Sequence, residues 1–349
     1  MKITQLTFTR FLAAIAIVIF HFRKEVFPFS VDSIKVITGF LNVLVSYFFV
    51  LSGFILTINA KGKIELKQFY FNRFSRIYPV YIFALLFTLL LIFSIRQPSY
   101  TLDFNRTFLS VFLVQSWNFK YALVYNYPAW SLSAEAFFYL LFPLIYNLLQ
   151  KLQFKKRLLI ILVFWLIMQG IFVFFSSNRA SFVVYNPFFH LSTFLMGILA
   201  GMLYREKYSW LVLHQKKLRH LFFISAILIL FLMLTENKLF SIAYHNGLLA
   251  PFFILLIFMI AEDWLPFISW FGNRSPEYLG EISYGIYILQ VPVYRLLTQT
   301  FNLDASISPT GLFYLFVLVL IIMSVVSYEL IEKPSRVFLR NNFNRYKQM

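Results

Sequence analysis

The sequence predicts an all-α integral membrane protein, a bundle of about ten transmembrane helices with both termini in the cytoplasm. Of the 349 residues, 60% are hydrophobic and 13% are charged. A soluble domain is about half apolar and about a quarter charged. Apolar runs of about 17–25 residues recur along the chain, and each is long enough to cross a bilayer core. Lys and Arg concentrate in alternate connecting segments, as they do in multi-pass proteins.

The apolar runs follow one another from the first residues to the last segment. Residues 107–115 are too short to span, and we expect an interfacial or re-entrant piece there. The predicted spans are 5–22, 36–58, 77–95, 131–149, 158–176, 188–204, 221–235, 246–262, 282–300 and 310–331.

Lys and Arg set the orientation. Most of the 31 Lys and Arg residues lie in segments that are cytoplasmic if the N-terminus is inside, namely 59–76, 150–157, 205–220 and the residues after 332. This bias predicts N-in and C-in, with the basic segments near anionic lipid of the plasma (inner) membrane. We therefore expect a transmembrane domain at 1–335 and a short basic cytoplasmic tail at 336–349.

Composition also excludes several classes of function. The net charge of +17 comes from short loops between apolar runs, so it indicates topology and not a nucleic-acid-binding face. The absence of cysteine excludes disulfides and thiolate chemistry. The spacing of the histidines matches no metal-binding pattern, so we expect no metal.

The first span carries two ionisable residues, Arg10 and His21. Such residues are costly inside a lipid-length helix, so a functional role is the default expectation. They are close to three helical turns apart, on roughly one face and about 16 Å apart along the axis. His21, near the outer end, is a candidate general base because its ordinary pKa lies near neutral pH. The alternative is an interfacial histidine whose ring is satisfied by neighbours.

Glu135 is the candidate partner of His21. It follows Pro128 and the hydroxyls of Ser131 and Ser133, which together look like the entry to a helix that runs from outside to inside. That reading places Glu135 about one turn below the outer surface, at the depth of His21, where it could orient the imidazole. The alternative is a carboxylate paired with an arginine for packing.

A basic cluster enters the third span from the cytoplasmic side. Arg73 and Arg76 are three residues apart and share a helical face. They could be simple positive-inside anchors, but Arg10 lies at the same end of its own span. Three converging arginines would suit phosphate groups, which guanidinium binds in a fork. With phosphates at one end and a base about 16 Å away, the geometry suits a donor with a long thin arm, such as coenzyme A.

Several stretches in this order resemble the acyltransferase-3 family of membrane acyltransferases, which O-acetylate or otherwise acylate extracytoplasmic glycans and related molecules. The match covers nearly the whole chain, and its strength lies in the order and spacing of the motifs. The matching stretches are Arg10-Phe-Leu-Ala-Ala with Phe20-His21-Phe22, Tyr47-Phe-Phe-Val-Leu-Ser-Gly-Phe54, Arg73-Phe-Ser-Arg76-Ile-Tyr-Pro79, Trp130-Ser-Leu-Ser-Ala-Glu135, Leu279-Gly-Glu-Ile-Ser-Tyr-Gly-Ile-Tyr287 and Ile331-Glu-Lys-Pro334.

The resemblance implies transfer from cytoplasmic acetyl-CoA to an acceptor hydroxyl outside, with the arginines at the donor and the histidine in catalysis. Two positions depart from the common family pattern: Ala136 stands where a second acid is frequent, and Gln290 where histidine is frequent. Many members also carry a C-terminal hydrolase-like domain. The short tail here suggests the stand-alone form, in which the membrane part finishes the transfer or hands the group to a separate protein.

The sequence therefore predicts a membrane O-acyltransferase, with an acyl-CoA donor and a glycan or lipid-linked saccharide as acceptor. His21 and Glu135 are the predicted catalytic residues, and Arg10, Arg73 and Arg76 the predicted donor-binding residues. One alternative is a proton-coupled transporter or flippase of envelope precursors, with His21 and Glu135 as a proton relay. A second is an accessory subunit of an envelope assembly complex. The acceptor's identity and the oligomeric state do not follow from the sequence.

Overall fold

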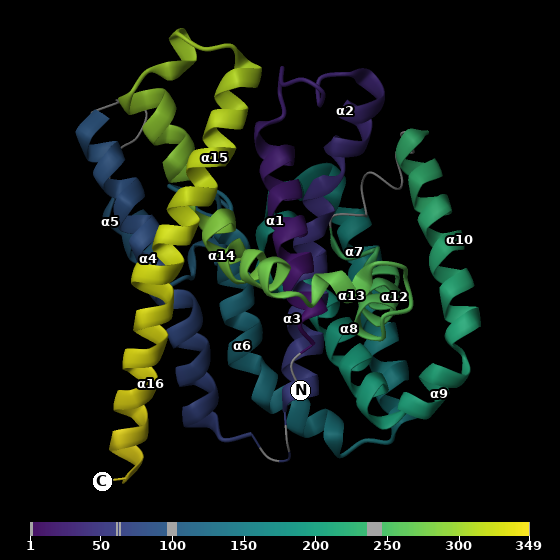
Figure 1. Cartoon of the computed structure of the whole chain (residues 1–349). Coiled ribbons are helices and arrows are strands. Elements are labelled where there is room, and N and C mark those ends of the chain that lie inside the picture. Colours follow the sequence, from purple (N-terminus) through teal and green to yellow (C-terminus); the bar gives the residue numbers. More distant parts are fainter. Residues whose placement is uncertain (1–2, 61, 63, 96–102, 236–245, 349) are drawn as a thin grey trace.

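The computed structural model describes residues 3–60, 62, 64–95, 103–235 and 246–348, and in these residues the chain is a bundle of helices without strands (Figure 1). The helices are α1 Gln5–Phe22, α2 Asp32–Gly39, α3 Leu44–Asn59, α4 Leu66–Ile95, α5 Phe104–Val111, α6 Ala129–Gln150, α7 Phe154–Tyr185, α8 Pro187–Glu206, α9 Tyr208–Leu213, α10 Gln215–Leu234, α12 Ala250–Ala261, α13 Ile268–Phe271, α14 Arg274–Arg295, α15 Pro309–Ser327 and α16 Lys333–Gln348. An all-α membrane-type fold is thus confirmed.

Eight helical stretches of the described chain are long and apolar enough to cross a membrane. They coincide with eight of the ten predicted spans. The other two predicted spans correspond to helices that do not meet these criteria of length and apolar character. At 246–262 the structure has α12, whose 12 residues would reach about 18 Å, less than a bilayer core. At 282–300 it has α14, which begins earlier and carries polar residues along its first turns. The count of ten and the orientation therefore stay predictions.

The predicted cytoplasmic segments gather at one end of the bundle. In Figure 1, α9 and the C-terminus of α16 lie in the lower half of the view, whereas α2 and the start of α15 lie in the upper half. The same view places α12, α13 and α14 around mid-height. Arg10 belongs to the lower part of α1 and His21 to its upper end, because α1 runs upward from the N-terminus.

Small residues bring α3 and α8 into close contact. A Cβ added to Gly53 would lie 2.3 Å from the carbonyl oxygen of Phe194, and one added to Gly197 would lie 2.1 Å from that of Val50. Glycine lets two membrane helices approach until their backbones touch. Gly53 is therefore a packing residue.

A second close contact fixes α1 against α14. A Cβ added to Gly280 would lie 2.1 Å from the carbonyl oxygen of Thr7. Because α1 also packs on α3, it is held between two helices over much of its length. The position of α1 in the bundle is therefore set by α14 on one side and α3 on another.

The segment that precedes α6 folds into the protein. Gln115, Ser116 and Asn126 are buried. The side-chain amide of Gln115 donates to the carbonyl of Ala129 at 3.1 Å, and that of Asn126 donates to the carbonyl of Ile288 at 2.8 Å. The N-terminus of α6 is thereby anchored to the middle of α14, so α6 begins inside the bundle. The predicted interfacial piece at 107–115 is partly helical, in α5.

The end of the chain continues as helix. A π-helical turn at Tyr328–Glu332 joins α15 to α16. α16 packs against α4, where the rings of Phe71 and Phe343 stack with centroids 4.6 Å apart. The segment 336–349, expected as a tail, is therefore helical as far as Gln348.

Candidate active site

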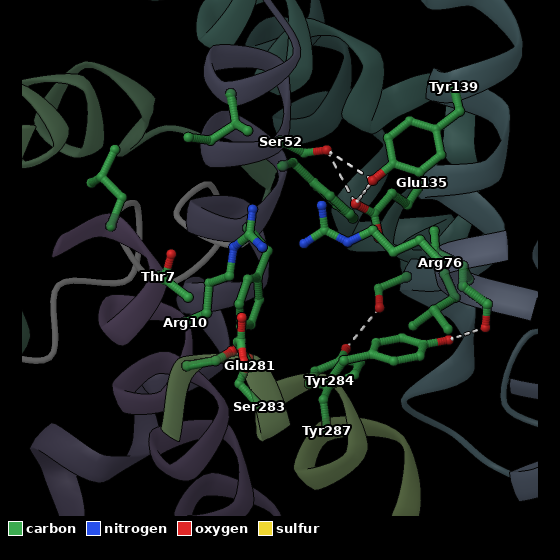
Figure 2. A pocket seen from close by; sticks show the side chains of 18 of the residues that line it. Thr7, Arg10, Ser52, Arg76, Glu135, Tyr139, Glu281, Ser283, Tyr284 and Tyr287 are labelled. Atoms are coloured by element: carbon green, nitrogen blue, oxygen red, sulfur yellow. Dashed lines mark hydrogen bonds between the residues drawn. The ribbon is translucent and has the colours of Figure 1, made fainter. Parts of the chain in front are cut away.

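A cavity of about 400 Å³ lies between α1, α3, α4, α6, α14 and the start of α16. Figure 2 shows that the guanidinium groups of Arg10 and Arg76 both point into it, from opposite sides. Tyr284 and Tyr287 also line it. The structure thus brings together two of the three arginines expected at the donor.

The two arginines are unpaired cations among paired carboxylates. Of the described residues, none forms an ion pair within 4 Å of Arg10 or Arg76. The three carboxylates that line the cavity are all engaged by other side chains. Glu281 accepts from the Tyr328 hydroxyl at 2.6 Å, and Glu332 pairs with Arg336. A ligand with negative charge would therefore find two available guanidinium groups.

Arg73 takes a different place from its neighbour Arg76. It does not line the cavity. Its guanidinium carbon lies 5.9 Å from the ring centroid of Phe69 and 5.7 Å from that of Tyr139, the geometry of a cation–π contact. Tyr139 does line the cavity, so Arg73 packs behind it. A direct role for Arg73 at the donor remains a prediction, and the contacts that it makes are with aromatic rings.

Glu135 lines the arginine cavity, and the predicted hydrogen-bonded pair with His21 is not formed. Its carboxylate accepts from the Ser52 hydroxyl at 3.1 Å and from the Tyr139 hydroxyl, as the dashed lines in Figure 2 mark. The sequence reading counted its depth from a helix entry at the outer surface. The residues at that entry are buried, and Asn126 just before them donates to the Ile288 carbonyl of α14, so the depth of Glu135 cannot be counted from an outer surface there.

His21 has a different partner. Its Nδ1 lies 2.6 Å from Oε1 of Gln290 on α14. Its ring meets the ring of Tyr127 edge-on, with centroids 4.7 Å apart. Burial raises the pKa of the Tyr127 phenol, so that side chain stays neutral beside the imidazole. Nε2 of His21 has no hydrogen-bond partner among the described residues.

Tyr287 lies on the part of α14 that links the cavity wall with the contact to His21. It lines the cavity, and its hydroxyl is 2.7 Å from that of Ser131 and donates to the carbonyl of Pro128 at 3.2 Å. One turn further along α14, Gln290 holds His21. His21 is not part of the cavity wall. On α14 the cavity lining thus extends as far as Tyr287, one turn before the residue that contacts His21.

Sequence reasoning missed several residues that the structure brings to these places. Ser52 had no predicted role at the site, yet its hydroxyl donates to Glu135. Gln290 was noted as a departure from a family pattern, without a contact. Arg336 was assigned to the tail but lines the cavity. Helical spacing offered a signal for Tyr139, which lies one turn after Glu135.

Comparisons with known proteins agree with the membrane-type fold. The structure is a membrane-type helical bundle with an arginine-lined cavity and a histidine outside that cavity. The family model described as "Acyltransferase domain" matches residues 3–329. The chain therefore belongs to the acyltransferase-3 family and carries its acyltransferase domain.

Two relatives illustrate the similarity. Acyltransferase MdmB of Streptomyces mycarofaciens is 33% identical over 163 residues, which are 44% of this chain and 42% of the relative. O-acetyltransferase OatA of Staphylococcus aureus is 25% identical over 356 residues, 94% of this chain and 56% of the relative. The chain thus spans about half the length of the curated relatives it matches. No solved structure matches.

Proposed function

We propose that this chain is a membrane O-acetyltransferase of the plasma membrane, which moves an acetyl group from cytoplasmic acetyl-CoA to a hydroxyl of an extracytoplasmic glycan. The observation that carries the proposal is the cavity into which Arg10 and Arg76 point without an ion-pair partner among the described residues. The domain's family and the name of OatA support the acyl group and the kind of reaction.

The cavity suits the phosphates of the donor. Guanidinium groups bind phosphate oxygens through paired N–H donors and keep their charge at any physiological pH. Arg10 and Arg76 belong to separate helices, α1 and α4, so together they can hold a diphosphate from two sides. Glu135, held by Ser52 and Tyr139, balances part of the positive charge in the absence of ligand. Arg336 could leave Glu332 to bind a further phosphate oxygen.

His21 supplies the base. In the proposed reaction, Nε2 of His21 takes the proton of the acceptor hydroxyl as its oxygen attacks the thioester carbonyl. The tetrahedral intermediate collapses with cleavage of the carbon–sulfur bond, which gives the acetyl ester and the thiolate of coenzyme A. The proton then passes from His21 to that thiolate. This step requires the pantetheine arm to pass Tyr287, the residue between the cavity and the histidine.

The acceptor is proposed from the family alone. A cell-envelope or secreted polysaccharide, or a lipid-linked saccharide precursor, would present hydroxyl groups at the outer end of α1. Mass spectrometry of envelope glycans, with and without the gene, would identify the acceptor and the acyl group together. Unchanged acylation after deletion would contradict the proposal and favour an accessory role.

A binding experiment tests the donor side directly. Calorimetry with purified protein should show that acetyl-CoA binds, and that Arg10→Gln with Arg76→Gln weakens binding by at least about tenfold. Lys216→Gln with Arg219→Gln is the matched control, because both residues are exposed on α10 and the changes remove the same two charges outside the cavity. Equal affinities of the double variant and the control would exclude the cavity as the donor site. Proton-driven flux without consumption of acetyl-CoA would favour a transporter instead.

A further inference from the structure

Gln290 is a fully buried glutamine in the middle of α14, and both ends of its amide are engaged. Its Oε1 lies 2.6 Å from Nδ1 of His21. Its Nε2 donates to the backbone carbonyl of Tyr287 at 2.7 Å. A buried polar side chain with both ends paired has one preferred orientation, since any other leaves a group unpaired.

The orientation of this amide follows from its backbone partner. A carbonyl oxygen can only accept, so the NH₂ group of Gln290 must face Tyr287. The amide oxygen therefore faces His21. The reversed amide would set two oxygens against each other at the Tyr287 carbonyl, 2.7 Å apart.

The amide oxygen in turn decides where the imidazole carries its proton. An oxygen acceptor at 2.6 Å requires a proton on Nδ1. A neutral imidazole has one N–H, so Nε2 then keeps its lone pair. When Nε2 gains a proton, the bond from Nδ1 persists, and the ring need not move during the reaction.

We propose that Gln290 is the positioning residue of His21, which fixes the Nδ1-protonated tautomer and leaves Nε2 as the nitrogen that takes the hydroxyl proton. The proposal rests on the proposed function only for the last step, the use of that nitrogen as base. It gives Gln290 the orienting role that the sequence assigned to Glu135, whose carboxylate is held by Ser52 and Tyr139. Because an amide is neutral, Gln290 orients the ring without adding the electrostatic stabilisation of imidazolium that a carboxylate would provide.

Nitrogen NMR of the full chain, labelled with ¹⁵N-histidine and placed in lipid nanodiscs, tests the tautomer without any need for turnover. The signal of His21 is identified by its loss in His21→Gln. We expect the Nδ1-protonated form to dominate in the wild type, and a mixture of tautomers in Gln290→Leu. A dominant Nε2-protonated form in the wild type, or the same tautomer ratio in Gln290→Leu, would overturn the proposal.

Kinetics test the consequence for the reaction. Release of coenzyme A would be followed with acetyl-CoA and membranes that retain the host glycan. Gln290→Leu should lower kcat by about a hundredfold, since small errors in the placement of a catalytic group have effects of that order. KM for acetyl-CoA should stay within about twofold, because the arginine cavity is unchanged.

Two further variants separate positioning from folding. Gln169→Leu is the matched control, because Gln169 is also a buried glutamine that donates to a backbone carbonyl, that of Asn246, away from His21. It should leave kcat per folded molecule unchanged. Gln290→Glu keeps an acceptor oxygen and adds charge, so the acidic limb of its pH profile should move to higher pH.

These outcomes distinguish the two claims. If Gln290→Leu equals Gln169→Leu in kcat, or if Gln290→Glu leaves the pH profile in place, Gln290 is not a positioning residue. If instead His21→Gln retains full turnover, the base of the proposed function is wrong, while the NMR result on Gln290 and the tautomer still stands.

Discussion

The two ends of α1 present different surroundings to their polar residues. Near the Arg10 end, α1 faces a cavity with charged groups of both signs, two of them cations without an ion-pair partner in the described chain. Near the other end, His21 is held by one neutral amide and enclosed by aromatic rings, those of Phe20, Phe22 and Tyr127.

In the proposed function this difference separates donor binding from chemistry. Arg10 faces a cavity that an anionic ligand could enter, whereas His21 lies outside that cavity. Tyr287 is the last residue of α14 that lines the cavity, one turn before Gln290. Donor affinity and transfer rate should therefore respond to different residues, and variants at each end can break or sharpen the distinction.

The largest effect is expected at His21. Removing a general base typically lowers a rate by about 10²- to 10⁴-fold, so His21→Gln should abolish transfer while acetyl-CoA affinity stays unchanged. Mass spectrometry of the acylated glycan and calorimetry with acetyl-CoA measure the two quantities. His220→Gln, an exposed histidine on α10, is the control. A large loss of donor affinity in His21→Gln would show that the two ends are not separate.

The next effect contrasts Arg76 with Arg73. Arg76→Gln should weaken acetyl-CoA binding by about tenfold, or about 1.4 kcal/mol, because Arg76 faces the cavity. Arg73→Gln should change affinity by less than about threefold and instead lower the thermal stability, because its contacts are with the rings of Phe69 and Tyr139. Calorimetry and thermal unfolding measure both variants side by side. Equal losses of affinity would place Arg73 at the donor after all.

The smallest effect is expected at Tyr287, where the cavity lining on α14 ends. Tyr287→Phe keeps the ring and loses the hydroxyl, which contacts Ser131 and the Pro128 carbonyl. Ser131 keeps its own bond to that carbonyl at 3.0 Å, so no buried group is left unpaired. We expect a loss of about 0.5–1.5 kcal/mol in the free energy of unfolding, with transfer within about threefold. A hundredfold loss of transfer would instead make the hydroxyl part of the chemistry.

Much of the fold followed from patterns that a sequence contains directly. Long apolar runs predicted most of the membrane-type helices. Arg10 and Arg76 could be brought together because both lie on apolar helices near segments rich in Lys and Arg. These signals are local. The length, apolar character and charge of a segment indicate its place in a membrane protein without knowledge of its tertiary contacts.

The rest depended on contacts between distant segments. The depth of Glu135 could not be counted from Pro128, because the residues before α6 fold against α14 and the start of α6 is buried. Gln290 is uncharged at physiological pH, so only its contacts with His21 and Tyr287 distinguish it from other buried amides. Pairing of this kind is decided by tertiary packing, which no single stretch of sequence specifies.

The helical link at Tyr328–Glu332 bears on where this domain can be cut. The family match stops at residue 329, yet Glu332 and Arg336 form part of the cavity wall, and α16 is braced on α4 through Phe71 and Phe343. A fragment trimmed to the matched residues would lack Glu332 and Arg336, so the cavity would lose part of its wall. Any fusion partner, affinity tag or grafted domain should accordingly be attached beyond this final helix.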